Sequence, residues 1–176
     1  TEDSARAIKG VTNSEGAEAS YGASTFTIVA SNGFIGSYRR TYTSLHAAVL
    51  AGDGTNMERD YDYASRVYMS DMPSAEDIGR KAGENAVKRL GARKMPTTQC
   101  PVVFDPRISG GIIGSLAGAI SGAAIARGTS FLKDKMGERI FADNITIVDD
   151  PFRPRGLRSR PFDAEGLLPT KRNIID

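Results

Sequence analysis

Hydrophobic and polar positions alternate along the first third of the chain, in the pattern typical of β-strands. The segments "TFTIVA" and "FIGSYRRTYTSL" are rich in β-branched and aromatic residues, and they flank Asn32 and Gly33. Asn-Gly is the dipeptide favoured in two-residue hairpins, because both residues tolerate positive φ. The segments 12–18 and 51–56 carry similar turn residues. Residues 1–65 therefore predict an antiparallel β-meander.

The hydrophobic period changes to that of a helix between residues 73 and 94. Ser74 and Asp77 are placed to cap the first turn, and Gly91 stands where a glycine commonly ends a helix. An apolar stripe recurs at intervals of four residues: Ile78, Ala82, Ala86 and Leu90. We expect a helix over residues 74–91 that packs on the sheet.

A second helical pattern is unusual in its glycines. In "GGIIGSLAGAISG", four of them recur at intervals of four residues and would line one stripe of a helix: Gly110, Gly114, Gly118 and Gly122. Each costs about 1 kcal/mol relative to alanine in a helix interior, so a compensating contact is expected. Close packing against another backbone is such a contact. We expect a buried helix over residues 108–126, in which Gly118→Leu is severely destabilising.

Two other interpretations of this stripe fail on composition and spacing. Nineteen uncharged residues separate Arg107 from Arg127, which is long enough for a membrane span. Most of them are Gly, Ala and Ser, which add little to insertion, and no Trp or Tyr marks an interface. A phosphate-binding loop needs Lys-Ser/Thr after its last glycine, and the dinucleotide fingerprint needs a different glycine spacing.

The segment "MPTTQCPVVFDP" carries a proline near each end and is typical of a linker followed by a short strand at 101–104. We place a domain boundary there. Residues 1–96 are expected to form a central α+β domain, an antiparallel meander with the packed helix. Residues 97–176 would begin a second, mainly β domain, with the glycine-striped helix and a strand at 139–148. The predicted fold class is α+β.

Composition and charge exclude little. The chain has 176 residues, of which 40% are hydrophobic and 25% charged, as in ordinary globular domains. The net charge of +2 gives no support for nucleic-acid binding. A single cysteine rules out an internal disulfide framework and fits a reducing compartment. The first residue is Thr1 rather than Met, which suggests a piece of a longer protein.

Candidate catalytic side chains are scarce. His46 is the only histidine, on a predicted strand, and we interpret it as a packed or surface residue. Cys100 is the only cysteine, has no visible activating partner and is interpreted as structural. Three carboxylates would share one face of a strand, where they could hold a hard cation, but a solvated face is favoured: Glu58, Asp60 and Asp62. A basic run could meet nucleic acid or an acidic partner, but we interpret it as a solvated or interface loop: Arg153, Arg155, Arg158 and Arg160.

Six stretches, taken together and in order, resemble the TldD/PmbA family, in the PmbA branch that is also called TldE and often labelled modulator of DNA gyrase. They are "RDYDYASR" (59–66), "RLGARKMPT" (89–97), "PVVFDP" (101–106), "SGGIIGSLAGAISG" (109–122), "GTSFLKDKMGERI" (128–140) and "RPFDAEGLLPTKRNIID" (160–176). Family members are considerably longer. The resemblance therefore implies a central domain and the opening of a C-terminal domain.

The resemblance also bears on metal chemistry. In the TldD branch, the helix after the double glycine carries His-Glu-x-x-x-His, whose histidines hold zinc. That motif, laid after Gly110 and Gly111, falls on Ser115, Leu116 and Ile120. Leucine and isoleucine have no lone pair to donate, and serine alone is a poor zinc ligand. The resemblance implies no catalytic residue, metal or cofactor in this chain, with zinc only in a TldD-type partner.

The implied function is a non-catalytic, cytoplasmic subunit that pairs with a TldD-type subunit as a heterodimer, or with itself, and acts on unfolded peptides. The family is linked with maturation of a gyrase-targeting peptide antibiotic and with breakdown of an antitoxin. Neither membrane contact nor direct nucleic-acid binding is expected. The alternative is an independent peptidase or peptide-binding module whose site lies outside this chain. We expect no peptidase activity from the chain alone.

Overall fold

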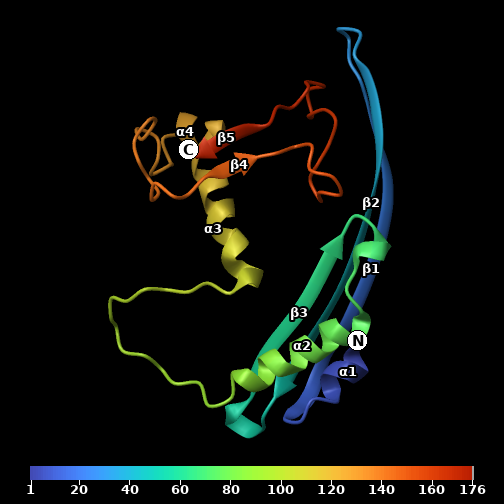
Figure 1. Cartoon of the computed structure of the whole chain (residues 1–176), viewed down its shortest axis with the longest axis vertical. Coiled ribbons are helices and arrows are strands. Elements are labelled where there is room, and N and C mark those ends of the chain that lie inside the picture. The colour runs from blue at the N-terminus through green and yellow to red at the C-terminus, as the bar shows by residue number, and fades with distance from the viewer. Residues whose placement is uncertain (176) are drawn as a thin grey trace. The chain divides into compact units, whose positions relative to one another are not determined.

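A computed structural model describes residues 1–175 and shows an α+β protein (Figure 1). A three-stranded sheet has the order β1-β2-β3, and a short two-stranded sheet pairs β4 with β5. The chain divides into two compact units. One holds residues 1–94 and 148–174, and the other holds mainly residues 95–147. The α+β prediction is confirmed.

β1 (Val11–Val29) and β2 (Ile35–Ala51) form a long antiparallel hairpin, and β3 (Glu58–Arg66) pairs with the second half of β2 (Figure 1). The hairpin connection covers residues 30–34, so it is longer than the two-residue turn that Asn-Gly predicts. The Asn32 side chain still accepts a hydrogen bond from the Phe34 backbone N–H at 3.0 Å. After β2, the short 3₁₀ turn η1 (Gly54–Asn56) reverses the chain as expected.

The start of β1 corrects one predicted turn. Residues 12–18 belong to the strand, although their register to β2 shifts between Val11 and Asn13 and again between Ser14 and Gly16. Gly16 has a φ of +103°, a conformation that other L-residues rarely adopt. The turn-forming residues of this segment therefore produce bulges in the strand and do not reverse the chain.

α2 (Ala75–Lys88) packs on the sheet, as its apolar stripe predicts. Its N-terminal cap is the Ser74 hydroxyl, which accepts a hydrogen bond from the Asp77 backbone N–H at 3.0 Å. Leu90, expected in the stripe, lies beyond the helix and is 37% exposed. The core joins small side chains of α1, β2 and α2: Ala5, Ala47, Val49, Ala51, Ala82 and Ala86.

A close approach of backbones occurs between α2 and α1 (Glu2–Arg6), a short helix that the sequence pattern does not predict. A Cβ atom at Gly79 would collide with the carbonyl oxygen of Thr1. A Cβ atom at Gly83 would lie 2.7 Å from the carbonyl oxygen of Ala5. These two glycines stand four residues apart on one stripe of α2. The close backbone contact that glycines permit is therefore found in α2, the first of the two predicted helices.

The glycine-striped segment forms two helices, α3 (Pro106–Ala119) and α4 (Gly122–Ala126), and only Leu116 and Ala119 of α3 are buried. The predicted burial of residues 108–126 is therefore wrong within residues 1–175, where most of these side chains are exposed. Apart from adjoining residues and the helix's own backbone, no described atom lies within 4 Å of a Cβ built at any glycine of the stripe: Gly110, Gly114, Gly118 and Gly122. Packing of the stripe against another part of the protein stays a prediction.

This exposure reverses the expected effect of substitutions at Gly118 in the 176-residue chain. We expect Gly118→Ala to stabilise α3 by up to about 1 kcal/mol, since alanine has the higher helix propensity and its Cβ meets no neighbour. Helix content and thermal unfolding, followed by circular dichroism, measure the effect. A clear loss of stability in this chain would show that Gly118 lies against another part of the chain.

Two strands expected in the second half are mostly irregular. Residues 101–104 form no strand, and within 139–148 only the end belongs to β4 (Ile147–Asp149). β4 pairs with β5 (Arg172–Ile175). Among residues 1–175, none of the helices has the length and apolar character needed to cross a membrane.

Candidate functional site

The three positions that the resemblance aligns with a metal motif lie on α3 and at its end. Ser115 is exposed, and its hydroxyl donates a hydrogen bond to the carbonyl oxygen of Gly111 at 2.9 Å. Leu116 is one of the two buried residues of the helix. Ile120 is the C-terminal cap residue and is partly exposed. The only hydroxyl of the three is therefore engaged with the helix backbone, and the other two side chains offer no ligand.

The remaining donor groups do not assemble a metal site in residues 1–175. No three side chains of His, Cys, Asp or Glu are grouped there so that they could hold a metal ion. His46 lies on β2, and Cys100 is exposed in the segment between α2 and α3. A hydrolytic zinc site needs about three protein ligands and an open position for water. The side chains of residues 1–175 do not fit such a site.

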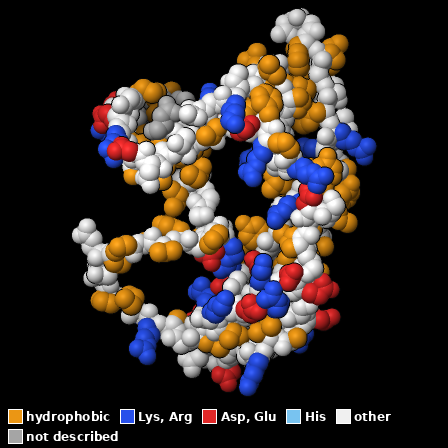
Figure 2. Space-filling view, in the orientation of Figure 1, with side chains coloured by type: hydrophobic (Ala, Val, Ile, Leu, Met, Phe, Trp, Pro, Cys, Tyr) orange, Lys and Arg blue, Asp and Glu red, His pale blue; other side chains and the backbone are white. Residues whose placement is uncertain are grey.

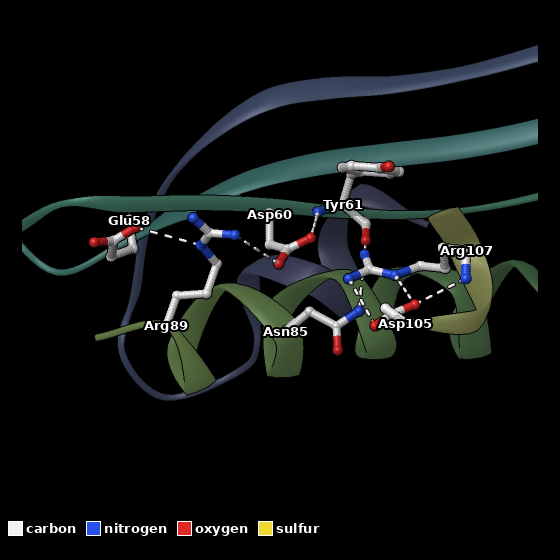
Figure 3. A network of polar contacts seen from close by, with 7 residues as sticks. All are labelled: Glu58, Asp60, Tyr61, Asn85, Arg89, Asp105 and Arg107. Carbon is white, nitrogen blue, oxygen red and sulfur yellow. Dashed lines mark hydrogen bonds and ion pairs between the residues drawn. The ribbon is translucent and has the colours of Figure 1, made fainter. Parts of the chain in front are cut away.

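Two carboxylates of β3, Glu58 and Asp60, contact the Arg89 side chain at the end of α2 (Figure 3). Asp60 is buried and accepts a hydrogen bond from the Tyr61 backbone N–H at 2.7 Å. Its other oxygen lies 3.8 Å from the Arg89 guanidinium, which also lies 3.4 Å from a carboxylate oxygen of Glu58. The interpretation of this strand face as solvated is wrong for Asp60. These contacts tie the end of α2 to β3.

Figure 3 also shows Asp105 and Arg107 at the start of α3. The Asp105 carboxylate caps the helix by accepting a hydrogen bond from the Arg107 backbone N–H at 2.8 Å. The Arg107 guanidinium, 3.1 Å away, and this backbone hydrogen bond lower the pKa of the Asp105 carboxyl. The pair is local to the helix start and fixes where α3 begins.

An aromatic cluster holds the segment 149–167 against the long hairpin. Phe162 is 7% exposed, and its ring centroid lies 5.3 Å from that of Phe34 and 5.2 Å from that of Tyr38. A Cβ atom at Gly36 would lie 2.7 Å from the Phe162 ring, so this position of the strand has no room for a side chain. The cluster thus seats a segment of the second half on strands of the first half, within one compact unit.

Arg155 is the second anchor of this segment. Its φ of +55° lies in the left-handed region, which is uncommon for residues other than glycine. Its guanidinium pairs with the Asp71 carboxylate and lies 4.8 Å from the ring centroid of Tyr68. Such a conformation persists where the surroundings impose it, and here an ion pair and a cation–π contact do so.

Two adjoining cavities lie along this segment, with volumes of about 380 and 1120 Å³. They share the lining residues Arg155, Gly156, Leu157 and Ser159. The smaller one is also lined by residues 38–41 of β2, and the larger one by residues near β4 and β5. We call the two cavities together the arginine groove.

The arginines of the basic run are exposed, in line with a solvated or interface loop, and they line the larger cavity: Arg153, Arg155, Arg158 and Arg160. The pattern "RPRGLRSR" is the local signal that could point to it. No local signal assigns Arg39, Arg40 or Arg66 to the same groove, because their place depends on a segment more than eighty residues further along the chain. Figure 2 shows Lys and Arg side chains gathered close to the long hairpin.

Comparisons with known proteins define the class. Residues 1–90 match the PmbA/TldA metallopeptidase central domain, and residues 97–176 match the C-terminal domain of the same metallopeptidases. The chain thus has the domains of a metallopeptidase-related protein. It belongs to the TldD/PmbA family.

Curated relatives agree with this membership. The chain is 37% identical over 172 residues to the metalloprotease PmbA of Escherichia coli O157:H7, an alignment that covers 97% of this chain and 38% of that relative. It is 34% identical over 167 residues to a PmbA homologue of Buchnera aphidicola, covering 95% of this chain and 37% of that relative. The chain thus spans less than two fifths of the length of these relatives.

Solved structures share the fold. A protein of Bacteroides thetaiotaomicron described as a modulator of DNA gyrase is 30% identical, with a TM-score of 0.88 over 99% of this chain and 41% of that one. A protein of Thermotoga maritima with the same description is 24% identical, with a TM-score of 0.91 over 99% of this chain and 40% of that one. TldE of Thermococcus kodakarensis is 23% identical, with a TM-score of 0.66 over 91% of this chain and 36% of that one.

Proposed function

We propose that this chain forms the central domain, residues 1–96, and the opening of the C-terminal domain, residues 97–176, of a non-catalytic PmbA/TldE-like subunit. The subunit works in the cytoplasm with a TldD-type zinc metallopeptidase on unfolded peptides. By the family resemblance, its tasks are maturation of a peptide antibiotic and breakdown of an antitoxin, and through them modulation of gyrase.

The observation that carries this proposal is the side-chain chemistry of α3. Where the resemblance aligns His, Glu and His, the helix offers Ser115, Leu116 and Ile120, of which one is a hydroxyl bonded to the backbone and two are hydrocarbons. A water molecule activated for peptide hydrolysis at neutral pH needs a bound metal or an equivalent base. The described residues hold no group of ligands for that metal, which supports a role in which the partner supplies the chemistry.

The test is a peptidase and zinc assay on the full-length protein, alone and with a TldD-type subunit. We expect no stoichiometric zinc and no turnover from the protein alone, and turnover on an unfolded peptide only in the mixture. The matched control is the mixture in which the metal-binding motif of the partner is inactivated by mutation. This mixture should show no peptide turnover. Chelator-sensitive turnover by the protein alone would overturn the proposal and favour an independent peptidase.

A gain-of-function variant sharpens the same test. Ser115→His, Leu116→Glu and Ile120→His together restore the His-Glu-x-x-x-His letters on α3. We expect zinc binding to stay weak and turnover to stay absent, because a third ligand and the groups that orient the histidines are still missing. Full activity of the triple variant without a partner would mean that the rest of a zinc site already exists in this protein.

A further inference from the structure

The lining of the arginine groove carries more positive than negative charges. Its walls carry eight arginines and four aspartates. The aspartates are all engaged: Asp71 pairs with Arg155, Asp149 lies 3.5 Å from Arg172 and Asp150 lies 3.1 Å from Lys171. Asp163 accepts backbone hydrogen bonds from Glu165 and Leu167 at 3.0 and 2.8 Å.

Asp150 illustrates how firmly these carboxylates are held. The hydrogen bond from the Lys171 ammonium, with a second from the Phe152 backbone N–H, lowers the pKa of the Asp150 carboxyl. The lowered pKa favours the ionised carboxylate beside Lys171. Six arginines of the lining are left with no carboxylate within 4 Å among residues 1–175: Arg39, Arg40, Arg66, Arg153, Arg158 and Arg160.

An open strand edge borders the same groove. β2 pairs with β1 from Ile35 onward, but β3 covers it only from Thr43 to Ala51. Residues 35–42 of β2 thus have no strand partner on their second side among the described residues. Residues 38–41 of this edge line the smaller cavity. In an antiparallel strand, alternate residues present their N–H and C=O groups to that side, which is the arrangement that accepts an added strand.

The segment that carries Arg158 and Arg160 is fixed in place by anchors already described. Phe162 seats it on the hairpin, and Arg155 ties it to Asp71 and Tyr68. The cationic wall is therefore positioned before any ligand arrives, which reduces the ordering cost of binding.

We propose that the arginine groove binds an acidic segment of an extended polypeptide, which adds as a strand to residues 35–42 of β2 while its carboxylates meet the unpaired arginines. Backbone pairing supplies affinity without regard to sequence, and the arginines select acidic side chains through charge-assisted hydrogen bonds. A nucleic acid has no amide backbone to pair with the strand edge. The inference goes beyond the proposed function and does not need a TldD-type partner, so either can fail while the other stands.

The experiment measures fluorescence anisotropy of labelled peptides with the full-length protein alone. The probe is a fluorescein-labelled peptide of about eight alternating Glu and Val residues, the length of the open edge. We expect it to bind, with an affinity that falls as salt rises, whereas the matching Lys/Val peptide does not bind. Equal binding of both peptides, or tighter binding of a single-stranded oligonucleotide of equal charge, would overturn the proposal.

Variants locate the site. Arg40→Gln, Arg158→Gln and Arg160→Gln together should weaken binding of the acidic peptide by about tenfold or more. A matched control removes three cations elsewhere that have no carboxylate within 4 Å in the described chain, Lys9→Gln, Arg93→Gln and Arg127→Gln, and should change binding less than about twofold. A similar loss in both triple variants would mean that only net charge matters, and would overturn the assigned site. All six side chains are exposed, so circular dichroism should report an intact fold in each variant.

Two methylated peptides test strand addition. The acidic peptide is N-methylated at every second residue, in two versions that are out of phase. Because a strand presents alternate N–H groups to its neighbour, one version should lose binding and the other should keep it. Equal binding of the two versions would overturn pairing with β2.

Discussion

Replacing Gly79 by alanine should destabilise the protein by about 2–3 kcal/mol, although alanine is the better helix former. The added Cβ would collide with the carbonyl oxygen of Thr1 and lie 3.1 Å from the backbone nitrogen of Ala5. These are backbone atoms of α1, so no side chain can rotate away and the whole short helix must move. Its displacement would expose Ala5, which is fully buried in the core cluster.

Chemical denaturation of the variant and the parent measures this loss. Gly118→Ala is the matched control, since it makes the same change in a helix where the Cβ meets no described atom. Opposite signs for the two substitutions would distinguish a close approach of backbones from helix propensity. A Gly79→Ala variant as stable as the parent would show that α1 does not rest on α2 in solution.

Phe162→Ala should cost about 3–4 kcal/mol, within the range for removing a buried phenylalanine. The ring is almost fully buried between Phe34 and Tyr38, and its loss leaves a cavity where a strand glycine, Gly36, offers no side chain to fill it. Because Phe162 seats the segment 149–167 on the hairpin, the same substitution should loosen that segment and weaken the arginine groove.

Denaturation gives the global effect, and amide hydrogen exchange over residues 149–167 gives the local one. Phe152→Ala is a control in the same segment. Its ring is 50% exposed, so we expect a loss of about 1 kcal/mol or less and unchanged exchange near Phe162. If Phe162→Ala leaves both stability and exchange as in the parent, the segment is not anchored by this cluster.

The close approach of α1 and α2 forms a glycine seam that the sequence pattern does not single out. Four glycines at regular intervals in residues 108–126 form the more conspicuous stripe, whereas Gly79 and Gly83 are only two. A missing side chain permits a close contact but does not create one. The contact at Gly79 exists because α1 packs against this part of α2. No local sequence pattern in either segment predicts that packing.

The arginine groove follows the same logic. The basic run at 153–160 is visible in the sequence, but its place along a cavity depends on the contact of Phe162 with the hairpin, more than 120 residues earlier in the chain. Asp60 likewise sits in an alternating strand pattern, and only the arrival of Arg89 from the end of α2 decides that it is buried and paired.

The sequence by itself determined the features that rest on near neighbours in the chain: the hairpin around Asn32 and Gly33, the cap of α2 at Ser74 and the side-chain chemistry of Ser115, Leu116 and Ile120. Propensity, capping and ligand chemistry act over a few residues, so they can be deduced without a fold. Tertiary structure alone decided which glycines meet a backbone, where α3 is exposed and which arginines share one groove. These depend on contacts between residues far apart in the chain, whose geometry is set by the packing of whole elements and not by any local pattern.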